Sequence, residues 1–248
     1  MDKPAKTAKR GRGRPRLEDA ENSTVVTRDT IIDLAFEQSR TRSLDDISFV
    51  QLAGELGVVP GSLHYHLGTK DDLNSAILNR FYRHLLTQLR AIPPGLPWQD
   101  TIRRYATTLM QSEIEHRGAA EHIQAKPKFR LFQKVRAGET DYGAAFFDHS
   151  LQLFRDCGFD ARNAALFYHV IGLHCLSAAT SASAKFEPTV HEAFLRERVT
   201  DAMRKTAPGI DFGIDAFVKI TAQEAFEIGL EALIDRFAKT RTGTGGPA

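Results

Sequence analysis

The side chains most able to make specific contacts in the N-terminal third lie on the short segment 60–67. Its polar and aromatic side chains offer hydrogen-bond donors and acceptors: Ser62, His64, Tyr65 and His66. Gly61 and Ser62, at its start, are small and allow close approach of another molecule. A helix that docks in a DNA major groove typically begins with small residues, and polar and aromatic side chains follow them. The chemistry expected here is therefore recognition of base edges and phosphates.

A helix-turn-helix pattern positions this segment. Ser48 begins a helix, and Gln51, three residues later, completes a capping box. Gly57 allows a tight turn at the end of that helix, and Pro60 suits the first turn of the next. Buried stripes are expected at Leu52, Ala53 and Leu56 and at Leu63 and Leu67. The alternative is an ordinary helical hairpin with an exposed polar face.

A third helix begins directly after the motif. Thr69 is its predicted N-cap, and Lys70, Asp71 and Asp72 form its first turn. A lysine beside free backbone N–H groups is a suitable place for a phosphate. We therefore expect Ser48 and Lys70, together with the polar face of 60–67, to contact DNA.

The first 16 residues form a basic segment. Seven of them are Lys or Arg and one is acidic, and they show no apolar periodicity, so disorder in isolation is expected. The run Arg12-Gly13-Arg14-Pro15, followed by Arg16, resembles an AT-hook. Such a segment could lie in a narrow A·T minor groove, or it could be a solvated tail or phosphate clamp. The sequence leaves both readings open, with Arg12, Arg14 and Arg16 as the candidate contacts.

From Val25 to about Phe81 the chain resembles the DNA-binding domain of the tetracycline-repressor (TetR) family. The resemblance rests on an apolar first helix through Ile31, Ile32, Leu34, Ala35 and Phe36, and on the runs Leu52-Ala53, Leu56-Gly57-Val58, Gly61-Ser62-Leu63, Tyr65-His66 and Gly68-Thr69-Lys70-Asp71-Asp72-Leu73. The chain departs from the family pattern at three positions. His64 replaces a common phosphate-contacting tyrosine, Leu67 a core aromatic, and Val59 the usual serine cap.

The resemblance implies an all-α protein with an N-terminal three-helix DNA-binding domain and a larger helical ligand-binding and dimerisation domain. We expect a disordered basic arm over 1–22, the helix-turn-helix domain over 23–82, the helical body over 83–240 and a disordered tail over 241–248. Helical patterns in the body cover 98–116, 118–124, 129–135, 142–157, 161–184, 190–206 and 221–239. No strand alternation or repeat is evident.

Two late helices are expected to form a homodimer interface, as the resemblance implies. The candidate residues are Leu166, Val170 and Leu173 on one helix and Phe226, Leu230, Leu233 and Phe237 on the other. Their spacing of three and four residues makes one apolar stripe on each helix. Burial of these stripes inside a single chain is the alternative.

The helical body should also contain an effector cavity. Aromatic residues that could line it are Trp98, Tyr105, Phe129, Phe132, Phe146, Phe147, Phe167 and Tyr168, and polar contacts could come from Glu113, His122, His149 and His174. The specific choices are Met110, Phe132, Phe147, Phe167 and His174. Aromatics at helical spacing are also ordinary core residues, so each choice competes with that reading.

Other classes of function find little support in the sequence. There is no Gly-rich phosphate loop, no Gly-x-Ser-x-Gly elbow and no His-Glu-x-x-His helix, so we expect no enzyme activity and no cofactor. His169 and His174 are five residues apart and diverge on a helix, so no metal site is expected. Cys157 and Cys175 lack metal or redox spacing and are expected to be buried thiols in the cytoplasm. No apolar run of 18 residues suggests a membrane span.

Positive charge is concentrated at the N-terminal end of the chain, before the predicted DNA-binding domain. The 248-residue chain has a net charge of +2, and the first 16 residues supply more than that, so the remainder is acidic. We therefore expect a ligand-responsive transcriptional regulator, most simply a repressor that binds a palindromic operator as a dimer and leaves when a small molecule binds. The alternative is an architectural DNA-binding protein whose helical body serves only dimerisation.

Overall fold

The computed structural model describes residues 26–126 and 128–241, and over these residues the chain is helical with no strand. The N-terminal elements are α1 (Arg28–Gln38), the short 3-10 helix η2 (Leu44–Asp46), α2 (Phe49–Leu56), α3 (Pro60–Leu67) and the long α4 (Lys70–Arg90). The body contains α5 (Trp98–Glu115), α6 (Arg117–Ala125), α7 (Tyr142–Asp156), α8 (Ala161–Ser183) and α12 (Ala222–Ala238). The all-α fold class is confirmed.

The helix-turn-helix forms as its local signals predict. Ser48 and Gln51 make the reciprocal capping box at the start of α2, and Gly57 ends that helix with φ of 68°. Thr69 and Asp72 make a second capping box at the start of α4. Val59, at the start of α3, makes no side-chain cap bond, so α3 begins with its proline alone.

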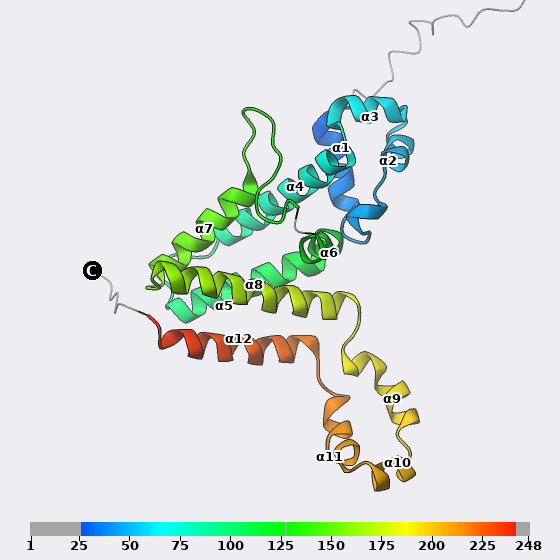
Figure 1. Ribbon diagram of the computed structural model, residues 1–248, viewed down its shortest axis with the longest axis vertical. Helices are drawn as coiled ribbons and strands as arrows, with labels where there is room; N and C mark the ends of the chain where they lie inside the picture. Colours follow the sequence, from blue (N-terminus) through cyan, green and yellow to red (C-terminus); the bar gives the residue numbers. More distant parts are fainter. Residues whose placement is uncertain (1–25, 127, 242–248) are drawn as a thin grey trace, which may run out of the picture.

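The long helix α4 joins the two parts of the chain. Its first half packs against α1 in the three-helix head, and its second half packs against α7 and α5 of the body (Figure 1). Eleven of its 21 residues are buried, including Leu73, Ile77, Phe81 and Leu85. Because one helix belongs to both cores, a tilt of α4 within the body necessarily moves the head.

In the body, α8 is the central helix and packs against α5, α6, α7 and α12. By length and composition alone, the stretch Ala161–Arg198, which contains α8, is apolar enough to cross a membrane, an outcome that the sequence patterns did not indicate. Packing against these four helices accounts for the buried apolar residues of α8, whereas Leu166 and Leu173 are exposed. Cys157 and Cys175 are buried free thiols, as predicted.

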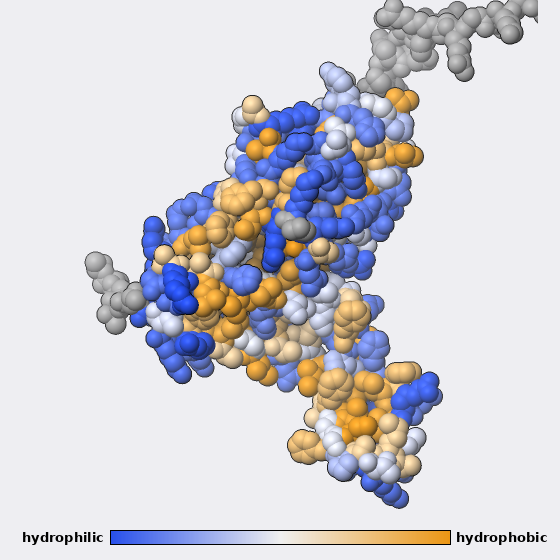
Figure 2. Space-filling model, viewed as in Figure 1, coloured by the Kyte–Doolittle hydropathy of each residue, from blue (hydrophilic) through white to orange (hydrophobic). Residues whose placement is uncertain are grey.

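A helical excursion projects from the body between α8 and α12 (Figure 1). It consists of η3 (Pro188–His191), α9 (Glu192–Arg198), α10 (Asp201–Thr206) and α11 (Pro208–Phe217), none of which has a buried residue. The single helical pattern predicted over 190–206 is thus broken in two, and α11 was not predicted. Apolar side chains gather on this excursion in Figure 2, and Phe212 is 94% exposed.

The predicted helix over 129–135 is wrong. This segment belongs to an irregular loop between α6 and α7. Phe129 has a φ of 62°, which an α-helix cannot accommodate. Contacts with α4 replace the missing helical bonds: the backbone N–H of Lys134 donates to Ser75 Oγ at 2.7 Å, and Asn79 donates to the carbonyl of Thr140 at 3.0 Å. Tertiary contacts therefore decide the conformation of this segment.

Part of the predicted dimer stripe on α12 lies inside the chain. Phe226, Leu230 and Phe237 are buried. Phe237 stacks on Phe167 of α8 with ring centroids 4.2 Å apart, and Phe226 stacks on His174 at 5.2 Å. These three side chains have almost no surface left for a partner, so their placement in a dimer interface is corrected to the core between α8 and α12.

This packing predicts that two substitutions to aspartate differ in their effect on the free energy of unfolding. Leu230→Asp places a charge at a site that is 3% exposed, and we expect it to lower the free energy of unfolding by several kcal/mol. Val50→Asp, on a side chain that is 68% exposed, should change it by less than about 0.5 kcal/mol. Urea unfolding followed by circular dichroism measures both. A Leu230→Asp variant that kept its stability but changed from a dimer to a monomer would contradict this assignment.

Candidate nucleic-acid interface and effector cavity

The outer face of α3 is open to solvent. Leu63 and Leu67 anchor the helix in the head core, while Tyr65 on the opposite side is 87% exposed. Gly61 is exposed, and Ser62 and His66 are partly exposed. Figure 1 places α3 at the end of the molecule opposite the projecting excursion. The sequence-predicted residues of 60–67 therefore form one accessible surface.

His64 lies against its own helix end. Its Nδ1 is 2.9 Å from the carbonyl oxygen of Gly68, which can only accept, so Nδ1 carries the proton. The ring also lies on Phe49, with centroids 4.3 Å apart. These two contacts hold the imidazole at the junction of α2, α3 and α4. In that orientation Nε2 is the free ring nitrogen, which accepts hydrogen bonds in the neutral ring and donates to a phosphate only when the ring is doubly protonated.

Ser48 and Lys70 are occupied by structural contacts. The Ser48 hydroxyl donates to Gln51 Oε1 at 3.1 Å and accepts from the Gln51 backbone N–H at 3.2 Å. The half-buried Lys70 ammonium donates to the carbonyls of Leu44 and Ile47, and burial lowers its pKa. Lys70 thus ties α4 to η2, and the expectation of a simple phosphate contact at this lysine is corrected. Arg12, Arg14 and Arg16 lie outside the described residues.

A cavity of about 230 Å³ lies where α4, α5 and α8 meet the loop between α6 and α7. Its walls are mostly aromatic and aliphatic, and they consist of Phe81, Tyr82, Tyr105, Leu109, Glu113, Ile123, Arg130, Leu131, Phe146, Tyr168, His169, Gly172 and Leu176. Tyr105, Phe146, Tyr168 and Glu113 were among the residues considered from sequence. A mainly apolar cavity with a few polar groups is typical of a small-molecule site.

Glu113 is the unsatisfied polar group of this cavity. The side chain is buried, and Oε2 has no hydrogen-bond partner in the described chain. Burial raises the pKa of its carboxyl well above the usual range, which favours the protonated form of the group. The neighbouring hydroxyls are satisfied, since Tyr82 donates to the Arg130 carbonyl and Tyr105 donates to Ser150 Oγ at 3.0 Å.

The five residues chosen from sequence for the effector do not line this cavity. Met110 is buried, and Phe167 is buried against Phe237. The Nε2 of His174 is 2.8 Å from the Phe226 carbonyl, so this imidazole joins α8 to α12. Phe132 is exposed on the loop, with Phe147 edge-on to it at 6.5 Å. Helical spacing identified Met110 and Phe167 as core residues, but it could not say which residues border the cavity.

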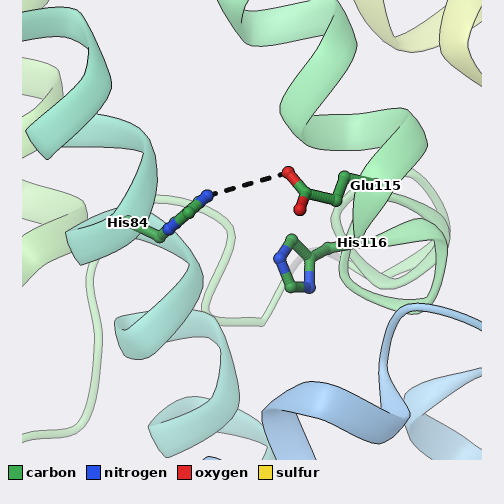
Figure 3. A group of neighbouring side chains, drawn as sticks. All are labelled: His84, Glu115 and His116. Atoms are coloured by element: carbon green, nitrogen blue, oxygen red, sulfur yellow. Dashed lines mark ion pairs between the residues drawn. The ribbon is translucent and has the colours of Figure 1, made fainter.

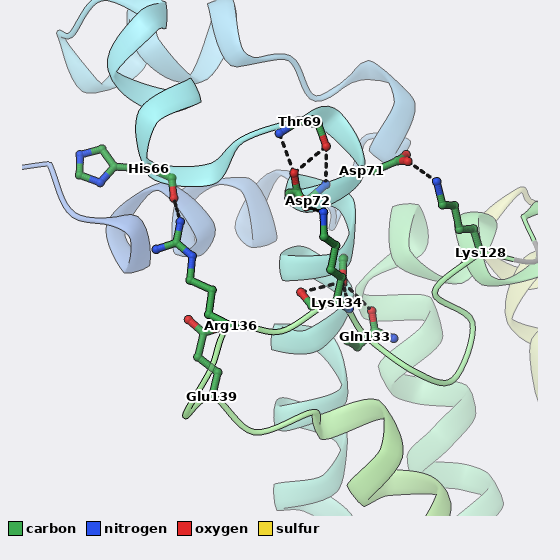
Figure 4. A network of polar contacts seen from close by, with 10 residues as sticks. His66, Thr69, Asp71, Asp72, Lys128, Gln133, Lys134, Arg136 and Glu139 are labelled. Atoms are coloured by element: carbon green, nitrogen blue, oxygen red, sulfur yellow. Dashed lines mark hydrogen bonds and ion pairs between the residues drawn. The ribbon is translucent and has the colours of Figure 1, made fainter.

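The loop between α6 and α7 lines the cavity and also contacts the head, and Figure 4 draws its contacts with the head. We call residues 128–140 the clasp loop. Arg130 and Leu131 form part of the cavity wall. Lys128 pairs with Asp71, Lys134 pairs with Asp72, and Arg136 donates to the backbone carbonyl of His66, as Figure 4 shows. The same short segment therefore touches the ligand-sized cavity and the junction of α3 and α4.

Asp72 is the most strongly held carboxylate of this junction. It accepts hydrogen bonds from the backbone N–H of Thr69 at 2.8 Å and from the Thr69 hydroxyl at 2.6 Å. The Lys134 ammonium and these bonds lower the pKa of its carboxyl to about 2. The carboxylate is therefore charged throughout the neutral range, and the contact between clasp loop and head persists there.

A second seam joins the head to the corner between α5 and α6. His116 at this corner stacks on Phe36 of α1, with ring centroids 4.0 Å apart. The backbone N–H of Gly118 donates to the Ser39 carbonyl at 2.8 Å. A Cβ at Gly118 would lie 1.9 Å from the Arg42 carbonyl oxygen, so only glycine permits this approach. The head thus rests on the body at two places, the clasp loop and this corner.

Comparisons with known proteins agree with this architecture. No family model matches the chain. The tetracycline repressor protein class D of Escherichia coli is 26% identical over 216 residues, which are 86% of this chain and 89% of that protein. The class H repressor of Photobacterium damsela subsp. piscicida matches with the same identity and coverage. Over most of its length the chain is therefore similar in sequence to tetracycline repressors.

Solved TetR-family structures share the fold. The Streptomyces coelicolor TetR family protein ActR in complex with actinorhodin has a TM-score of 0.68 at 19% identity, covering 90% of this chain and 100% of that one. A single-residue variant of TetR from Acinetobacter baumannii, in complex with minocycline, has a TM-score of 0.59 at 17% identity, covering 88% of this chain and 99% of that one. The likeness extends through the helical body as well as the DNA-binding head.

The hydrogen bonds of Lys70 predict a role in stability rather than a contact with a DNA phosphate. Lys70→Met should lower the free energy of unfolding by about 1–3 kcal/mol, because two buried carbonyls lose their donor. Lys128→Met, which removes an exposed pair with Asp71, should cost less than about 1 kcal/mol. Urea unfolding of both variants measures this difference. Equal stability, with a lower salt dependence of DNA binding in Lys70→Met alone, would restore the phosphate role.

Proposed function

We propose that this protein is a TetR-family repressor that binds a palindromic DNA operator as a homodimer and is released by a small-molecule effector. The observation that carries the DNA part is the exposed face of α3, where Tyr65 projects beside Gly61 and Ser62. A helix anchored on one side and polar on the other fits the major groove. Gly61, Ser62, Tyr65 and His66 are the proposed base and phosphate contacts, and His64 contributes through Nε2.

Dimerisation is proposed through the outer faces of α8 and α12. Leu166 and Leu173 on α8 are exposed, as is Ile228 on α12. Val170 and Leu233 are partly buried beside them. An exposed apolar surface on two adjacent helices suits pairing with the same surface of a second copy. Two heads held in this way would read two half-sites of one palindrome.

The effector is proposed to occupy the cavity beside the clasp loop. About 230 Å³ suits one small, largely apolar or aromatic molecule. The buried Glu113 carboxyl offers the molecule a hydrogen-bond partner that no group of the described chain engages at Oε2. The solved relatives with actinorhodin and with minocycline support a bound organic molecule in this fold.

Release follows from the double role of the clasp loop. A molecule that enters the cavity would meet Arg130 and Leu131, which form part of its wall, and would push them outward. Lys134 and Arg136, only a few residues further along the same loop, contact the start of α4 and the end of α3. Their displacement would alter the angle of α3 relative to the body. The two recognition helices of a dimer would then no longer match their half-sites.

Selection on random duplex DNA with the full chain tests the proposal. We expect one near-palindromic site, and Tyr65→Ala should weaken binding to it by about 1–3 kcal/mol. The control is Phe186→Ala, another exposed aromatic, at the end of α8, which should bind normally. No site preference, with long cooperative coating, would favour the architectural alternative. Full affinity in Tyr65→Ala would contradict the recognition role of α3.

A further inference from the structure

Three potential metal ligands meet between α4 and the corner of α5 and α6 (Figure 3). They are His84 of α4, Glu115 at the end of α5 and His116 directly after it, and one ligand atom from each lies within 4.8 Å of the others. His84 Nε2 is 3.7 Å from Glu115 Oε2. This cluster lies outside the effector cavity described above, and sequence spacing did not reveal it, because His84 is far from Glu115 and His116 along the chain.

The buried His116 ring presents an unused nitrogen to this cluster. Its Nδ1 is 3.4 Å from Ser39 Oγ, and the Ser39 hydroxyl already donates its hydrogen to the Phe36 carbonyl at 2.6 Å. Ser39 Oγ can therefore only accept, so the proton of the neutral ring is on Nδ1. The Nε2 lone pair is left free, and Nε2 is buried with no hydrogen-bond partner in the described chain.

His84 also presents a lone pair at Nε2. Gln88 Oε1 accepts from Ser112 Oγ at 2.9 Å, so the Gln88 amide group faces His84 and donates to its Nε2, 2.9 Å away. The imidazole nitrogen that faces Glu115 is thus an acceptor in the neutral ring, and its lone pair is engaged by the Gln88 amide, which an incoming metal ion would displace. Two neutral imidazoles with Nε2 lone pairs are the donor type that zinc and related ions prefer.

Glu115 supplies the third ligand, and its neighbours hold it in place. Arg40 of the head donates to Oε1, which leaves Oε2 directed at His84. The charged groups that face His116 are Arg40, Glu115 and Glu37, together one negative charge. Ser39 on the imidazole and Arg40 on the carboxylate are the outer hydrogen-bond partners that orient ligands in metal sites.

We propose that His84, Glu115 and His116 bind a divalent transition-metal ion of the zinc class. Two imidazoles and one carboxylate leave at least one coordination position for water. Packing alone would account for a buried His116 between aromatic rings, but it leaves the Nε2 lone pair unsatisfied and does not explain the two further donors beside it.

The ion would tie the head to the body. Bonds of about 2.0–2.2 Å require the three donors to draw closer together than they now lie, and the partly exposed His84 and Glu115 side chains can move while buried His116 stays. The ion would therefore fasten α4 to the corner on which α1 rests, restricting the tilt of the head.

Zinc titration of the chelator-treated full chain, free of any added histidine tag, tests the site. Competition with a fluorescent zinc chelator should give one tight ion per chain, and Zn²⁺ should raise the melting temperature, whereas Mg²⁺ should do neither. His84→Ala and Glu115→Gln should each weaken Zn²⁺ binding at least about tenfold and abolish the thermal shift. His191→Ala, at an exposed histidine of the projecting excursion, is the matched control and should bind like the unmodified chain.

Circular dichroism of the metal-free variants verifies their fold, and both replaced side chains are partly exposed. Wild-type affinity in His84→Ala, or loss of binding in His191→Ala alone, would overturn the proposed site, as would absence of a zinc-dependent thermal shift in the unmodified chain. The measurement uses no DNA and no effector, so its outcome is independent of the proposed regulatory function.

Discussion

The attachment of the clasp loop to α4 is the constraint on which the rest of the structure depends. Tyr82, inside the body, donates to the Arg130 carbonyl, while Asp72, at the head, pairs with Lys134. Only a few residues of one loop thus separate the cavity wall from the start of the long helix. Closely packed interiors respond to a ligand by changing between discrete arrangements rather than by stretching. A loop this short cannot yield at the cavity and remain fixed at the head.

The energies of these contacts suit a switch. Exposed ion pairs such as Lys128 with Asp71 contribute up to about 1 kcal/mol each, and a hydrogen bond from a charged group such as Arg136 contributes roughly 1.5–3 kcal/mol. Coupling between two sites in regulated proteins amounts to about 1–3 kcal/mol. In the proposed mechanism, the few contacts of the clasp loop would therefore be strong enough to orient the head and weak enough for one bound molecule to displace.

Local sequence signals predicted the elements well, because their causes are local. Ser48 with Gln51, Gly57 and Thr69 each fixed a helix end through bonds to residues within four positions. Where the decisive partner is distant, the sequence misled. Lys70 faces the carbonyls of Leu44 and Ile47, far away along the chain, and Phe129 adopts positive φ in a loop held by α4. The apolar period on α12 was correct, but it could not show that Leu230 faces α8 of its own chain.

The candidate sites also differ in whether their causes are local in the sequence or depend on distant residues. The exposed face of α3 was predictable because buried anchor residues and outward residues alternate on one short helix. The cavity wall and the His84, Glu115 and His116 cluster depend on how helices cross, which a single sequence does not encode locally. Gly172 illustrates the difference: it lines the cavity, and a Cβ there would have no heavy atom within 4 Å.

That open space permits the most direct test of coupling between cavity and head. Gly172→Phe places a ring where an effector is proposed to bind, whereas Gly172→Ala changes the helix without filling the space. Operator affinity of the two folded dimers, measured by fluorescence anisotropy without any added ligand, is the decisive quantity. Binding at least about tenfold weaker in Gly172→Phe than in Gly172→Ala is expected if a filled cavity displaces the clasp loop. Equal operator affinity of the two variants, with both cavities verified by structure, would contradict the account.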